Sequence, residues 1–122
     1  MRRALVLLVA LLPACAVIGH ERVEGWPELE VVEHYVPERE MQARCQRYVG
    51  FGMLPMACAE FDLAARKCHI WYSADSLTPG FIRQHERMHC AGYDHIGSTG
   101  MQRFLDQHTS RQASSAAAGS SK

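Results

Sequence analysis

Residues 85–95 read His-Glu-Arg-Met-His-Cys-Ala-Gly-Tyr-Asp-His and are the most informative stretch of the 122-residue chain. The preceding Thr78-Pro79 is typical of a helix start, with threonine as N-cap and proline at the first helical position. Helices commonly end at a residue such as Gly92, because glycine accepts a positive φ without a side-chain clash. The pattern therefore predicts a helix from Thr78 to about Ala91, followed by a sharp bend.

Two histidines and a glutamate on this predicted helix are candidates for chemistry. His85 and His89 are four residues apart, so their side chains leave the same helix face and their ring nitrogens can converge on one metal ion. Glu86 lies about 100° further round the turn. From there its carboxylate can approach a water molecule at the metal without being a ligand itself.

A catalytic zinc ion needs a third protein ligand and one open position. No glutamate follows Glu86, which excludes a downstream glutamate ligand. The remaining downstream donors are Asp94, His95, Asp106 and His108. We favour His95, because a positive φ at Gly92 would turn the chain back toward the helix. Asp94 is the next candidate.

The full spacing, His-Glu-x-x-His-x-x-Gly-x-x-His, resembles the zinc motif of the metzincin metallopeptidases. The resemblance implies one Zn²⁺ ion held by three histidines, with Glu86 as the catalytic general base. The three implied ligands are His85, His89 and His95. Metzincins also carry a methionine-containing turn beneath the metal, and Met101 is the candidate for it. The alternative is that Met101 is an apolar residue of the last helix.

The rest of the chain shows strand and helix patterns on both sides of the motif. Residues 28–36 predict a strand, and residues 38–48 predict a helix with an acidic first turn and a basic last turn. The apolar-alternating runs 56–62 and 68–73 predict a hairpin, and residues 99–111 predict a final helix. We expect an α+β fold: a short antiparallel or mixed sheet packed on the active-site helix, similar to the upper subdomain of zincins.

The N-terminal residues predict export. Met-Arg-Arg precedes an apolar run over residues 4–12, which is too short for a membrane-spanning helix and predicts a signal peptide over residues 1–14. Leu-Pro-Ala-Cys at 12–15 resembles a bacterial lipobox, which implies a lipid anchor on Cys15 and a place in the cell envelope, on the periplasm-facing membrane. The alternative is ordinary cleavage and secretion. With this leader, the chain resembles a small exported lipoprotein of bacterial or phage type.

The mature chain divides into three predicted parts. Residues 15–27 contain glycine, proline and charges without periodicity, and predict a tether to the membrane. Residues 28–109 are predicted to be the metallopeptidase-like domain. Residues 110–122 consist mostly of serine, alanine, glycine and glutamine, and predict a disordered tail.

Four cysteines follow Cys15. They are Cys45, Cys58, Cys68 and Cys90. Their spacing contains no Cys-x-x-Cys pair, so in an exported chain they predict two disulfides and not a thiolate metal site. Four cysteines allow three pairings, and the sequence does not choose among them. Cys90 follows His89 directly, but it points about 100° away from that side chain and is interpreted as a disulfide partner.

The charge balance limits the partners. The chain has 13 basic and 13 acidic residues and no basic cluster, which argues against nucleic-acid binding. The expected partners are a peptide or protein substrate and, through Cys15, a membrane. The remaining histidines have no matching spacing and are interpreted as packing or surface residues, with His20 solvated in the tether. They are His20, His34, His69 and His108.

Three functions are compatible with these features. One is a zinc metallopeptidase that hydrolyses peptide bonds with metal-activated water. The second is a non-catalytic envelope lipoprotein with a structural or vestigial metal site. The third is a nickel or copper carrier that uses the same three histidines, which differs in metal preference and not in spacing. An open fourth coordination position favours the first, and a fourth protein ligand favours the second.

Overall fold

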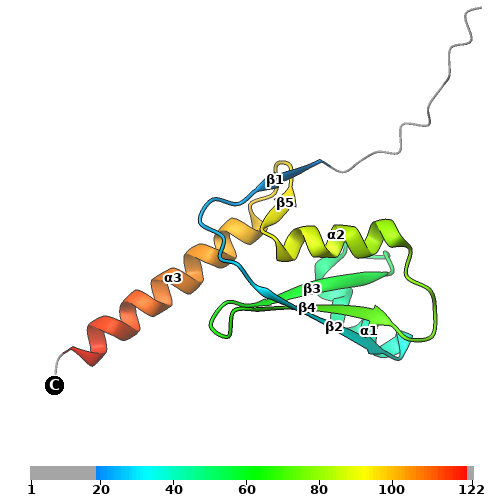
Figure 1. Ribbon diagram of the computed structural model, residues 1–122, viewed down its shortest axis with the longest axis horizontal. Helices are drawn as coiled ribbons and strands as arrows, with labels where there is room; N and C mark the ends of the chain where they lie inside the picture. The colour runs from blue at the N-terminus through cyan, green and yellow to red at the C-terminus, as the bar shows by residue number, and fades with distance from the viewer. Residues whose placement is uncertain (1–18, 121–122) are drawn as a thin grey trace, which may run out of the picture.

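The computed structural model describes residues 19–120, which form an α+β fold as expected (Figure 1). In chain order its elements are β1 (His20–Arg22), β2 (Glu30–Val36), α1 (Glu38–Cys45), the 3-10 helix η1 (Gln46–Tyr48), β3 (Ala57–Asp62), β4 (Lys67–Ser73), α2 (Gly80–Cys90), β5 (Tyr93–His95) and α3 (Gly100–Gly119). They make one sheet of three strands and one of two.

The larger sheet has the order β2-β4-β3. β4 pairs parallel to β2 and antiparallel to β3, so the predicted hairpin is confirmed and the sheet is mixed. β4 is the central strand, and Cys68, Ile70 and Tyr72, which share one of its faces, are all 0% exposed. Both edges of β4 are paired, so no extended peptide can add to residues 68–73 as a further strand.

A helix covers each face of this sheet. Ile70 and Tyr72 pack in one apolar cluster with Cys90 of α2. On the opposite face Trp71 packs against a second cluster that contains Met41 of α1. Figure 1 shows α2 and α1 on the two sides of the strands. The alternation along β4 therefore gives each helix its own core.

Two disulfides fasten these layers, as the sequence predicts. Cys45–Cys58 joins the last residue of α1 to β3, and Cys68–Cys90 joins β4 to the last residue of α2. The second bond fixes the end of α2 directly beside His89. Cys90 is thus a disulfide partner and offers no thiolate to a metal.

The N-terminal segment is part of the domain. β1 pairs antiparallel with β5, and Val23 and Trp26 are buried in a third cluster with Leu63 and Met101. The predicted tether is therefore wrong for the described residues from His20 onward. Two apolar residues in a polar segment show no periodicity, so the pattern gave no sign that they are core residues.

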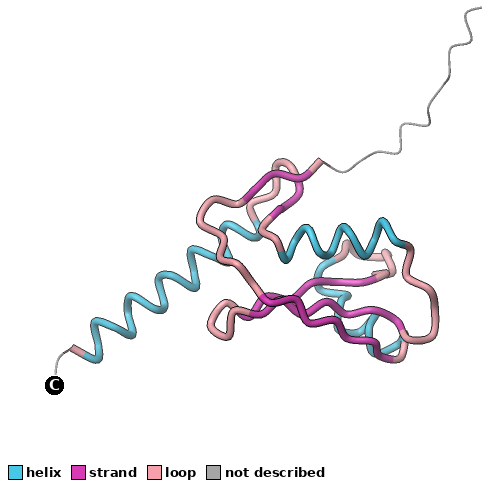
Figure 2. Tube along the Cα trace, in the orientation of Figure 1, coloured by secondary structure: helices cyan, strands magenta, loops and turns pink. Residues whose placement is uncertain are grey.

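The last helix is longer than predicted. α3 runs to Gly119 and extends away from the sheets (Figure 2), so residues 110–119 are helical where a disordered tail was expected. Met101 is its one buried residue in the described part of the chain. Beyond residue 110 the helix is exposed, and the helix propensity of its alanines supports it. Serine hydroxyls there donate to carbonyls one turn earlier, as Ser114 does to Ser110.

Within residues 19–120, no helix combines the length and apolar character needed to cross a bilayer. The predicted signal peptide, the lipobox and Cys15 lie outside the described residues.

Candidate metal centre

Helix α2 presents its two motif histidines to one point, as their spacing predicts. The Nε2 atoms of His85 and His89 lie 3.1 Å apart. Ligands of one tetrahedral zinc with metal–nitrogen bonds of about 2.05 Å would lie about 3.3 Å apart. The observed separation therefore suits two imidazoles that share an ion. The helix starts at Gly80 with Pro79 as N-cap and no side-chain cap, so the predicted N-cap at Thr78 is wrong by one residue.

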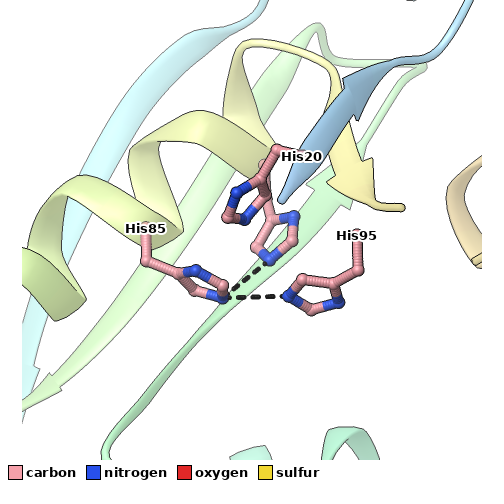
Figure 3. Close-up of side chains that lie close together, drawn as sticks. His20, His85 and His95 are labelled. Carbon is pink, nitrogen blue, oxygen red and sulfur yellow. Dashed lines mark hydrogen bonds between the residues drawn. The ribbon is translucent and has the colours of Figure 1, made fainter. Parts of the chain in front are cut away.

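The bend after α2 brings in a third imidazole. Gly92 has φ +91°, and beyond it the three-residue strand β5 ends at His95. The Nε2 atom of His95 lies 3.2 Å from that of His85 (Figure 3). Glycine is required at the bend twice over, because a Cβ at position 92 would also lie 2.7 Å from the indole of Trp26.

Hydrogen bonds orient two members of this group. The Nδ1 atom of His89 lies 2.7 Å from the Tyr93 carbonyl oxygen. A carbonyl only accepts, so Nδ1–H donates and the lone pair of Nε2 faces the other imidazoles. Asp94 accepts the backbone N–H of His95 at 2.8 Å and thereby holds the end of β5.

Asp94 organises the turn into α3 and is not one of the converging donors. Its carboxylate also accepts from the Ser98 hydroxyl at 2.9 Å and from the Met101 N–H at 3.0 Å. Burial alone would raise the pKa of Asp94, but these hydrogen bonds outweigh it and lower the pKa below its usual range. The Met101 side chain lies in the cluster with Val23 and Trp26, which corresponds to the interpretation of Met101 as an apolar helix residue.

Glu86 is held in a buried position beside the larger sheet. It is 8% exposed, and its carboxylate accepts a hydrogen bond from the backbone of Ala59 on β3. Burial raises the pKa of Glu86 to about 7, although the Ala59 hydrogen bond opposes the shift. A carboxyl group with this pKa exchanges protons readily near neutral pH.

His20 joins the group as a fourth imidazole, which sequence reasoning missed. One ring nitrogen of each of the four metal-site histidines, His20, His85, His89 and His95, lies within 4.8 Å of the others. The ring of His20 is 4.8 Å from that of His85, between centroids (Figure 3). A pairing between β1 and β5, which are far apart in the sequence, leaves no local signal. His20 was therefore assigned to a solvated tether, and that assignment is wrong.

The charge state of the metal-site histidines suits a cation. Burial, followed by the neighbouring imidazoles, lowers the pKa of His85 to about 4, and burial also lowers the pKa of His89. Both rings are neutral at pH 7 and offer lone pairs, as metal ligands must. The Nε2 atom of His20 is buried with no hydrogen-bond partner. The four residues thus form a potential metal-binding site of all-nitrogen donors, a set that fits Zn²⁺ and related transition metals.

The other candidate donors lie elsewhere. Among residues 19–120 the metal-site histidines are the one group with three or more convergent donors. Asp106 accepts a hydrogen bond from Gln102 on α3, and His108 lies further along that helix. His34 and His69, here called the sheet histidines, contact each other on the larger sheet, with Nε2 and Nδ1 2.8 Å apart.

No protein family, curated protein or solved structure matches this chain.

Proposed function

We propose that this protein is a zinc-dependent metallopeptidase of metzincin-like type. The observation that carries the proposal is the approach of three Nε2 atoms, at 3.1 Å and 3.2 Å, from one helix and a glycine bend. His85, His89 and His95 would hold the ion, and Glu86 would be the general base. The spacing that yields this geometry resembles the metzincin motif, which supports the assignment.

The reaction is hydrolysis of a peptide bond. Bound Zn²⁺ would supply Lewis acidity, which makes water a better acid and polarises a carbonyl. Glu86 takes a proton from the attacking water as the water oxygen bonds to the carbonyl carbon. It then gives the proton to the amine nitrogen as the carbon–nitrogen bond breaks. The pKa of about 7 that burial gives Glu86 suits both transfers.

Export and membrane attachment belong to the same proposal. The two disulfides are typical of chains that fold outside the cytosol. Together with the lipobox-like residues ending at Cys15, they support an envelope lipoprotein that acts on a peptide or protein substrate.

A second candidate function is a non-catalytic envelope protein whose metal stabilises the fold. The presence of His20 beside the other three imidazoles favours it, because structural zinc sites use four protein ligands.

The substitution Glu86→Gln separates the two functions. We expect the variant to bind zinc as the wild type does and to lose hydrolysis of a denatured test protein by about 10²- to 10⁴-fold. Glu40→Gln removes an exposed carboxylate on α1 and is the matched control, with unchanged activity. Equal hydrolysis by the wild type and Glu86→Gln would contradict the proposal.

A further inference from the structure

We propose that His20 is a fourth metal ligand and that β1 is a latch, which closes the metal site in the conformation described. The inference rests on the proposed metallopeptidase function and adds a means of controlling it. With all four imidazoles bound to the ion, no position remains for the water that hydrolysis requires. When β1 leaves β5, that position opens.

Strand register aims His20 at the site. In the β1–β5 pair His20 lies directly opposite His95. Directly opposed residues of an antiparallel pair project from the same face. The two rings are therefore neighbours, with centroids 5.2 Å apart, and both approach His85 of α2.

The environment of the His20 ring lacks the partner that a buried nitrogen needs. Its Nε2 atom is buried and makes no hydrogen bond, an arrangement that is unfavourable in the absence of a ligand. No carboxylate belongs to the group of four converging donors. A cation shared with the other three imidazoles removes this penalty and completes a four-coordinate shell.

The strand can detach without unpacking the core. β1 has three residues and pairs with β5 alone, and so small a sheet is weak. The anchors of the segment, Val23 and Trp26, are 6% and 5% exposed and lie downstream of His20. The Val23 N–H also donates to the Gly92 carbonyl at 2.8 Å. Residues 19–22 can therefore lift away while the segment from Val23 onward stays in place.

The test counts the nitrogen ligands of bound zinc by X-ray absorption on the mature chain. We expect four imidazoles in the wild type. His20→Ala should give three imidazoles and one oxygen ligand from water. Arg22→Ala, an exposed residue of the same strand, is the matched control and should keep four. His20→Asn, which keeps a polar side chain of similar size, provides a second variant, and circular dichroism checks that each one folds.

Two further measurements extend the test. In competition with a chelator, His20→Ala should bind zinc at least about tenfold more weakly than Arg22→Ala, since even loss of a residue that only supports a ligand costs about 10- to 100-fold. Hydrolysis of a denatured test protein should be faster for His20→Ala than for the wild type. The double variant His20→Ala/Glu86→Gln should lose that gain.

The outcomes distinguish the latch from the proposed function. Three imidazoles in both the wild type and His20→Ala would overturn the latch, even if Glu86-dependent hydrolysis is observed. A change from four ligands to three without hydrolysis in any variant would support His20 as a ligand and overturn the peptidase, and with it the regulatory role of β1.

Discussion

The metal-site histidines and the sheet histidines make different contacts because different secondary structure carries them. His85 and His89 project from one helix face toward His95, and the Nε2 atoms of the three rings converge. His34 and His69 instead project from adjacent strands, and their contact of 2.8 Å is a hydrogen bond in which one ring must donate. The His34 ring also stacks on Trp71 with centroids 3.9 Å apart. Convergence of three or more ring nitrogens, and not proximity of two rings, distinguishes a potential metal-binding site.

The largest expected effect tests this distinction directly. His89→Ala should weaken zinc binding by about 100-fold or more, because it removes a ligand and the hydrogen-bonded tautomer that orients it. His69→Ala should leave zinc affinity unchanged. Chelator competition measures the zinc affinity of both variants. An equal loss of affinity in the two would contradict the distinction between the two groups.

Each of the two disulfides lies near one of these two histidine groups. Cys45–Cys58 closes a separation of 13 residues beside Trp71, and Cys68–Cys90 closes a separation of 22 residues at the end of α2. Replacing either pair by alanine should lower the free energy of unfolding by about 2–5 kcal/mol. Only loss of Cys68–Cys90 should also weaken zinc binding, since Cys90 follows His89. Denaturant unfolding and zinc titration together check this, and a zinc defect in both variants would disprove the division.

A pair of glycine substitutions measures the bend that delivers His95. Gly92 and Gly97 have φ values of +91° and +81°, but only at Gly92 would a Cβ meet Trp26. Gly97→Ala should lower the free energy of unfolding by about 1 kcal/mol, because the backbone is strained. Gly92→Ala should lower it by about 2–4 kcal/mol, because strain and overpacking act together. Denaturant unfolding gives both values. Equal losses would show that the contact with Trp26 does not constrain the bend.

The smallest effect concerns Glu33 on β2, which pairs with Arg87 of α2 at 2.8 Å. The hydrogen bond from Arg87 outweighs burial and lowers the Glu33 pKa from 4.5. The contribution of ionised Glu33 to the stability of the fold is therefore complete above pH 4.5. It is lost as the pH falls through the lower pKa that Glu33 has in the folded state. At pH 7 the free energy of unfolding of the wild type should exceed that of Glu33→Gln by about 0.2–1 kcal/mol.

Acid unfolding provides the check on Glu33. The difference in unfolding free energy between the wild type and Glu33→Gln should shrink when the pH is lowered from 7 to about 3. Glu40→Gln, which removes a carboxylate with no contact to α2, is the control. A difference that stays constant with pH would contradict the assigned pKa direction.

Local patterns predicted the parts of the fold that local physics determines. Helical spacing placed His85 beside His89, and strand alternation found the β3–β4 hairpin, which the structure confirms. The glycine at position 92 indicated a bend, and the structure brings His95 to the other two rings. The presence of four cysteines in a chain predicted to be exported indicated two disulfides. Their pairing could be assigned only from the folded structure.

The parts that the sequence did not predict depend on distant contacts. Trp26 is buried because it packs on Gly92 and Phe61, so nothing near it in the chain identifies it as core. The position of His20 follows from that same packing. β4 is central because β2 pairs with it in parallel. The two strands are not joined by a hairpin turn, so no turn signal in the sequence predicts this pairing. The C-terminal alanines and serines are compatible with both tail and helix.

The chain has two tryptophans, and they lie in different parts of the fold. Trp26 lies against the bend at Gly92, and Trp71 stacks on His34. A Trp71→Phe protein therefore carries a single indole, 5% exposed, at the joint between α2 and β5. Its fluorescence would follow metal loading and strand release in real time, without an added label.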